Sequence, residues 1–176
     1  MTHGADRYAI CYHMSMSDNS YTATVKGKPV TFTHRGASVM PDFKHVTSVS
    51  VIPFTTEGNI VAVRLRHRGL DLPGGHVEPG ESTPEETLNR EVREEACMTV
   101  RTPVLTEVVE SDYFEQPSYM LLYAAFVDKL HEFEPSDEAA ERVEVSPEEF
   151  IRQYAAGNKQ LMAATIEAGW QLLNRP

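Results

Sequence analysis

Three glutamates are spaced in a way that favours metal binding. Glu91, Glu94 and Glu95 are three and four positions apart, and in an α-helix this spacing places them on one face. Like charges this close destabilise a helix unless a cation joins them. Carboxylate oxygens suit Mg²⁺ or Mn²⁺ better than zinc. The spacing therefore predicts a divalent-cation site on this segment.

Residues near these acids can orient them. Arg90 can donate a forked pair of hydrogen bonds to Glu81 or Glu94, which would hold a ligand carboxylate in one rotamer. Upstream, Leu72-Pro73-Gly74-Gly75 ends a short predicted strand, and paired glycines permit a close approach that a side chain would block. The Gly75 carbonyl could supply one more oxygen ligand.

The acids need a helix, and the sequence predicts one from Thr83 to about Cys97. Thr83-Pro84-Glu85-Glu86 has a capping threonine, a proline at the first helical position and a glutamate that closes a capping box. Leu88, Val92 and Ala96 form an apolar stripe beside the acids. We therefore expect the helix to pack on one side and to present its carboxylates at the edge of the packed surface.

This region resembles the Nudix box. The resemblance rests on Gly75, five residues, Glu81, and then Arg90-Glu91-Val92-Arg93-Glu94-Glu95-Ala96-Cys97-Met98. Eight residues instead of seven separate Glu81 from Arg90, and we place the additional one at Ser82, in the loop. Cys97 stands where the family has glycine, which is favoured at a helix end because it adopts left-handed geometry cheaply, so this departure concerns the turn that ends the helix and not the ligands.

The resemblance implies a Nudix-type α/β/α sandwich with a mixed sheet, and hydrolysis of a diphosphate linkage in a nucleoside diphosphate derivative. Carried over to this chain, Glu91, Glu94 and Glu95 would bind Mg²⁺ together with the Gly75 carbonyl, and Glu81 and Arg90 would support them. The base that activates water would be Glu91 itself or Glu138.

Residues outside the box are candidates for substrate binding. Arg64 and Arg66 form a basic stripe with His67 and Arg68 and could bind phosphates. The alternative is that these alternating charges simply line the solvent-exposed face of a strand. Tyr113 and Phe114 could stack a planar ring, with core packing as the alternative. Nucleoside triphosphates, nucleotide sugars, ADP-ribose and dinucleoside polyphosphates all remain open as substrates.

The remaining pattern predicts an α/β fold with an N-terminal addition. We expect residues 1–40 to form an extension with a hairpin and residues 41–176 to form the Nudix domain. A hairpin is marginally stable alone, so it could also pair across a homodimer. The expected strands are Tyr21–Lys26, Val30–His34, Val46–Phe54, Ile60–Leu65, Val104–Val109, Tyr119–Val127 and a late strand near Val143; two further helices follow Ser146 and Asn158.

Composition limits the classes of partner. The formal charge is −10, which disfavours nucleic acid and anionic lipid and leaves a small phosphorylated substrate bound through cations. The longest apolar stretch, Met120–Val127, is too short to span a bilayer. Two cysteines, Cys11 and Cys97, give no disulfide framework and suggest the cytoplasm. Two rival functions are a non-catalytic nucleotide sensor, which would not need all three glutamates, and an isomerase, for which neither cysteine has a supporting motif.

Overall fold

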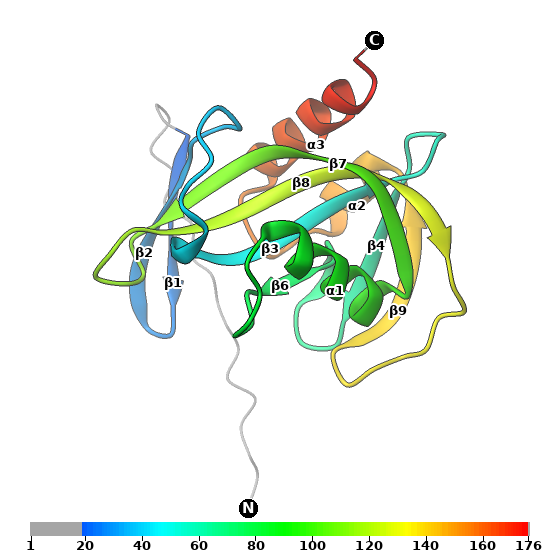
Figure 1. The fold of residues 1–176 in the computed structure, drawn as a ribbon, viewed down its shortest axis with the longest axis horizontal. Coiled ribbons are helices and arrows are strands. Elements are labelled where there is room, and N and C mark those ends of the chain that lie inside the picture. Colours follow the sequence, from blue (N-terminus) through cyan, green and yellow to red (C-terminus); the bar gives the residue numbers. More distant parts are fainter. Residues whose placement is uncertain (1–18, 176) are drawn as a thin grey trace, which may run out of the picture.

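The computed structural model describes residues 19–175, which form a mixed sheet with helices on both faces (Figure 1). Within that range the strands are β1 (Ser20–Val25), β2 (Lys28–His34), β3 (Val46–Phe54), β4 (Ile60–Leu65), β5 (Gly69–Asp71), β6 (Gly74–His76), β7 (Met98–Ser111), β8 (Ser118–Leu130) and β9 (Ala139–Val145). The helices are η1 (Phe43–His45, a 3-10 turn), α1 (Pro84–Ala96), α2 (Pro147–Gln153) and α3 (Lys159–Leu173).

The sheet combines parallel and antiparallel pairing, as predicted. Its strand order is β1-β2-β7-β8-β3-β4-β5, with β6 also paired to β3 and β9 to β4. The pair β3–β8 is parallel, and the other pairs are antiparallel. The strand β8 lies between β7 and β3 and is buried over its middle part, which agrees with its nearly continuous apolar sequence.

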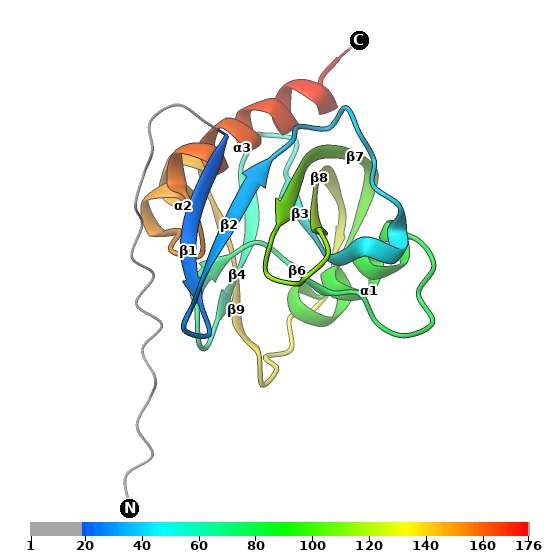
Figure 2. The ribbon, with the colours of Figure 1, turned by 90° about the vertical axis from the view of Figure 1, so that its left-hand side faces the viewer.

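The helices divide the core into two layers. Helix α1 packs against β3, β6 and β7 on one face, while α2 and α3 cover the other (Figure 2). The predicted stripe of Leu88, Val92 and Ala96 is buried in the first layer, and Phe54 and Phe150 are buried in the second. The α/β/α sandwich expected from the sequence is therefore present. None of the helices in residues 19–175 is long and apolar enough to cross a membrane.

Strands β7 and β9 begin earlier in the chain than predicted. Strand β7 begins at Met98, immediately after α1, and β9 begins at Ala139. The early part of β7 includes Arg101, which is charged, and Pro103, which lacks a backbone N–H. Neither residue type is among those enriched in strands, so the sequence pattern did not predict a strand here. Pairing with β8, such as Thr99 with Lys129, extends the strand despite this weak local preference.

The N-terminal hairpin is part of the main sheet. Its turn is at Lys26-Gly27, so Lys26, expected as the last residue of the first strand, belongs to the turn; both turn residues have positive φ, as two-residue hairpin turns require. Strand β2 pairs with the end of β7, where His34 faces Val109. The hairpin thus gains its stability within its own chain, and the homodimer stays a prediction. Residues 1–18 of the extension, including Cys11, lie outside the described residues, and the boundary at residue 40 also stays a prediction.

Helix α1 is capped at both ends. The predicted capping box is present, with Thr83 and Glu86 each accepting a hydrogen bond from the other's backbone amide. At the other end Cys97 adopts the left-handed conformation with φ 47°. Nη1 of Arg142 donates to the carbonyls of Ala96 and Cys97 at 2.7 and 2.9 Å. Cysteine therefore makes the turn for which glycine is usually needed, with strain.

That strain leads to a stability prediction. Replacing Cys97 with glycine should increase the free energy of unfolding by about 0.5–1 kcal/mol, because the left-handed penalty exceeds the extra chain entropy of glycine. Urea denaturation would measure the change. Cys97→Ala is the matched control, since alanine keeps the penalty and should stay close to the native value. Equal stabilities for the two variants would contradict the assignment of strain.

Candidate active site

Strand β6 brings the glycine pair against the acids of α1. Gly75 pairs with Val49 of β3 in the sheet, and the backbone amide of Gly74 donates to Oε2 of Glu95 at 2.9 Å. A side chain on Gly75 would overlap the carboxylate of Glu91, and one on Gly74 would overlap Ser50. Gly75 is therefore needed for the close approach of the Glu91 carboxylate, and Gly74 for the close approach of β6 to β3.

The three glutamates differ in environment. The residues Glu91 and Glu95 are only 7% and 4% exposed, and burial raises the pKa of both, that of Glu95 to about 7 despite the Gly74 hydrogen bond. The side chain of Glu94 is 60% exposed. The cluster thus has two carboxylates inside the fold and one at the surface.

Arg90 connects the acids to the loop before the helix. Its Nε donates to Oε1 of Glu81 at 2.8 Å, and its Nη1 donates to Glu91 at 2.7 Å and to Glu94 at 3.2 Å. Its Nη2 donates to the His76 carbonyl at 2.7 Å. The predicted contacts with Glu81 and Glu94 are present, and the contacts with Glu91 and His76 were not anticipated. These bonds, first of all that with Glu81, raise the pKa of Arg90, so its positive charge is permanent.

Glu81 anchors the loop rather than facing the other acids. The hydrogen bond from Arg90, with those from the Glu78 amide and the Thr87 hydroxyl, lowers its pKa to about 2. Thr87 is fully buried in α1, and sequence reasoning missed it. The available signal was its position, because Thr87 is a polar residue four positions before the predicted ligand Glu91, on the side of the helix next to the apolar stripe.

The donor set fits a hard divalent cation. In residues 19–175, no three His, Cys, Asp or Glu side chains are already grouped to hold a metal ion, and the exposed Glu94 contacts Arg90. The buried pair Glu91 and Glu95 nevertheless has pKa values raised by desolvation, and a cation between such carboxylates would relieve that penalty. Their oxygens, with the adjacent Gly75 backbone, match the preference of Mg²⁺.

Charges from other elements act on this cluster. Glu138 is exposed in the loop before β9, and its charge contributes to the raised pKa values of Glu91 and Glu95. Arg68 acts in the opposite direction and lowers the pKa of Glu95. The fold therefore brings the predicted alternative base, Glu138, within electrostatic range of the acids. Arg68 is a nearby cation that was noticed in the sequence only as part of the basic stripe.

The predicted substrate-binding residues are dispersed. The guanidinium of Arg64 contacts Glu141 and Gln153, on the side of the sheet that α2 covers, and Arg66 donates to the Ser136 carbonyl in the loop that carries Glu138. Tyr113 and Phe114 form an edge-to-face pair, with ring centroids 4.9 Å apart, in the β7–β8 loop. Arg66 therefore contacts the loop that carries Glu138, whereas Arg64 does not, and all four assignments remain predictions.

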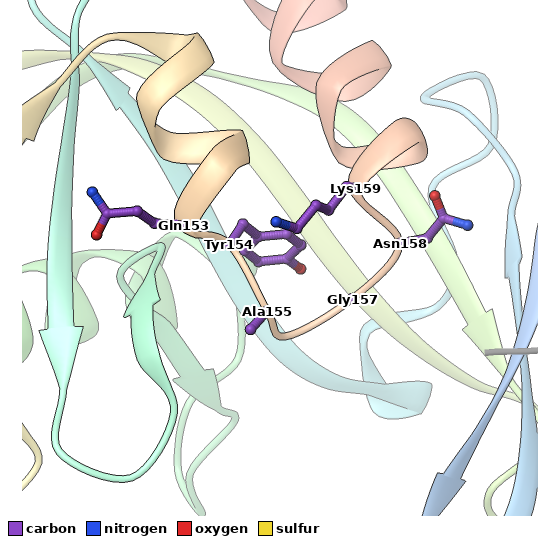
Figure 3. A pocket seen from close by; sticks show the side chains of 6 residues that line it. All are labelled: Gln153, Tyr154, Ala155, Gly157, Asn158 and Lys159. Carbon is purple, nitrogen blue, oxygen red and sulfur yellow. The ribbon is translucent and has the colours of Figure 1, made fainter. Parts of the chain in front are cut away.

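A hollow of about 410 Å³ lies elsewhere, in the connection between α2 and α3 (Figure 3). Tyr154 and Lys159 both line it, and Nζ of Lys159 donates to the Arg152 carbonyl. None of the residues that line this hollow is an acid. It lies on the face opposite α1, so we do not assign the chemistry to it.

Comparison with known proteins identifies the family. A family model described as the NUDIX domain matches residues 44–165. The chain belongs to the Nudix family. The matched range contains all of the box residues, and the expectation of a Nudix hydrolase is confirmed at the level of the family.

Solved structures support the same fold. A Bacillus subtilis pyrophosphohydrolase, BsRppH, solved as a mutant, is 23% identical with a TM-score of 0.65 over 80% of this chain and 93% of its own. A NUDIX hydrolase from Nitrosomonas europaea is 21% identical with a TM-score of 0.58, over 74% and 90%. A C. elegans Ap4A hydrolase in a binary complex is 19% identical with a TM-score of 0.54, over 72% and 96%. A comparison with curated protein sequences found no match.

The buried Glu95 predicts a pH effect on the metal-free Nudix protein. Its pKa is about 7 in the folded chain against 4.5 as the ordinary value, so the folded state holds the proton more tightly. The stability that this group contributes is complete below pH 4.5 and is lost as the pH rises to about 7. Urea unfolding with a chelator should show that Glu95→Gln removes part of the decline between about pH 5 and about pH 8. Parallel declines in the native and variant proteins would contradict the assignment.

Proposed function

We propose that this Nudix protein hydrolyses a diphosphate linkage in a nucleoside diphosphate derivative or a related small phosphorylated molecule, with Mg²⁺ as the cofactor and Mn²⁺ as a substitute. The observation that carries the proposal is the burial of Glu91 and Glu95 against the Gly74-Gly75 backbone, with Glu94 beside them at the surface. Burying such carboxylates without a cation destabilises the fold, so their arrangement favours a bound ion.

Each residue of the site has a proposed task. Glu91, Glu94, Glu95 and the Gly75 carbonyl would hold the ion, which when bound would neutralise phosphate oxygens and lower the pKa of an attacking water. Arg90 would orient Glu91 and Glu94, because its Nη1 already contacts both. Glu81 would keep Arg90 in place, through the 2.8 Å bond between Oε1 and Nε.

Binding of a phosphorylated substrate is opposed by the net negative charge of the chain. A formal charge of −10 repels a phosphorylated substrate at long range, so bound cations and local arginines must supply the attraction. We assign the phosphate contact to Arg66 first, because its guanidinium binds the loop that carries Glu138, and Arg64 would act only on a part of the substrate that reaches the α2 side. Tyr113 and Phe114, the latter 55% exposed, offer aromatic faces for a ring.

The setting of the reaction is also part of the proposal. The structure gives Cys97 as a free cysteine, which is compatible with the predicted reducing cytoplasm. We expect no nucleic acid or membrane partner, because both recognise basic surfaces. The non-catalytic sensor remains the alternative, and turnover itself separates it from a hydrolase.

The first test is metal-dependent turnover. The native chain should cleave at least one of a panel of nucleoside triphosphates, nucleotide sugars, ADP-ribose and dinucleoside polyphosphates with Mg²⁺ but not with a chelator. Glu94→Gln should lower kcat on the order of 100-fold, because a neutral amide is a poor ligand for a hard cation. Product separation by anion-exchange chromatography measures both.

Glu85→Gln is the matched control for this test, since Glu85 is exposed on the same helix, outside the capping box and the acid cluster. Its turnover should equal that of the native chain. Ligand binding without turnover of any member of the panel would favour the sensor instead.

A second test distinguishes the two candidate bases. If Glu138 activates water, Glu138→Gln should lower kcat by about 100-fold while the Mg²⁺ concentration for half-maximal rate stays the same. Glu91→Gln should change both quantities, because Glu91 would also hold the ion. A near-native kcat for Glu138→Gln would assign the base to Glu91. The measurement is initial rate against Mg²⁺ concentration for both variants.

A further inference from the structure

A second pocket lies on the same face of the sheet as α1, and part of it comes from outside the matched Nudix region. Its volume is about 230 Å³, and it is lined by Arg35, Val39, Pro41, Val108, Glu110 and Tyr119. The first three residues belong to the linker between β2 and η1, ahead of residue 44, where the family match begins. Both ribbon views show this linker passing across β7 and β8 on the side of α1 (Figures 1 and 2).

The pocket is within reach of a ligand bound at the acids. Tyr119 is paired with Val46 of β3, whereas Gly75 is paired with Val49, three residues further along. With about 3.3 Å per residue along a strand and about 4.8 Å between strands, Tyr119 lies roughly 14 Å from Gly75, and its partner Glu110 on β7 lies roughly 17 Å from it. Tyr119 and Val108 contribute to the core layer that contains α1, so pocket and carboxylates share one face of the sheet.

Hydrogen bonds anchor the backbone of the linker and one nitrogen of the Arg35 side chain, which is 52% exposed. The backbone amide of Arg35 donates to the Val108 carbonyl at 2.8 Å, and the next amide, of Gly36, donates to Glu107 at 2.5 Å. Nε of Arg35 donates to Oε2 of Glu110 at 2.9 Å. Among the described residues, Nη1 and Nη2 of Arg35 have no hydrogen-bond partner. The pocket therefore presents a two-pronged donor beside a carboxylate.

The walls around this donor are apolar. Val39 is 66% exposed and is followed by the exposed Met40, while Val108 and the ring of Tyr119 form part of the lining. Drug-sized ligands occupy pockets of about 300–1,000 Å³, so a smaller hollow suits one flat ring system. A phosphate would suit it less, because Glu110 lies against the guanidinium and would repel an anion.

We propose that this pocket, the linker subsite, binds the nucleobase of the substrate and selects guanine. An arginine fork matches the adjacent O6 and N7 acceptors of guanine, and apolar side chains accept the faces of the ring. The separation from Gly75 allows a base in the linker subsite and a diphosphate at the acids within one molecule. This inference rests on the proposed function, because it assigns the substrate class for the same site.

Turnover of matched substrates tests the linker subsite. Using the substrate type that the native chain cleaves, in guanosine and cytidine forms, the native protein should have the lower KM for guanosine. Arg35→Met should raise the guanosine KM about tenfold, leave kcat unchanged and remove the preference. Arg101→Met, at an exposed arginine of β7 that does not line the pocket, should behave as native. An unchanged KM and preference in Arg35→Met would overturn the proposal.

Binding without turnover separates this inference from the proposed function. Calorimetry of the full chain with guanosine 5′-monophosphate, in the presence of a chelator, should show binding that Arg35→Met weakens about tenfold. Arg35→Lys keeps the charge but lacks the fork, so it should also lose the preference over cytidine 5′-monophosphate. Retained preference in Arg35→Lys would overturn the role of the fork. Arg35-dependent binding by a chain that cleaves nothing would uphold the linker subsite and reject the hydrolase.

Discussion

The contact between two buried carboxylates and a glycine backbone is the constraint around which the site is built. Glu95 accepts a hydrogen bond from the Gly74 amide, and the Glu91 carboxylate fills the space that a side chain on Gly75 would need. This contact fixes the distance between α1 and β6, and through β6 the distance from α1 to β3. The apolar packing of α1 must be compatible with it, because the same helix buries Leu88 and Val92 a turn away.

Arg90 reduces the electrostatic repulsion among these carboxylates when no other cation is bound. Two desolvated carboxylates and a third at the surface repel one another, and one guanidinium with a permanent charge contacts Glu91 and Glu94 while Glu81 holds it from the other side. A lysine could not make these contacts together with the bond to the His76 carbonyl. The arginine thus belongs to the framework that holds the acidic cluster in place.

The sequence predicted those features that local patterns determine. Helix α1, its capping box, its acidic edge, strands β3 and β4 and the α/β/α layers follow from spacing, capping residues and apolar periodicity. The early part of β7, the burial difference between Glu95 and Glu94, and the placement of Arg64 away from the acids did not follow, because they depend on pairing and packing between distant segments. The linker pocket was missed for the same reason, since Arg35 and Glu110 are 75 residues apart.

The parallel pairing of β3 with β8 has a consequence for how the chain assembles. Val46 and Tyr119 are partners in that pair, so the centre of the sheet closes only after the intervening helix and β7 exist. Pairings between such distant segments form slowly, because a long loop must close first. During synthesis the ribosome releases the acidic helix before the strand that completes its support. The acidic cluster therefore takes its final arrangement late, as a property of the whole sheet, and a partly made chain holds its glutamates without the fold that orients them.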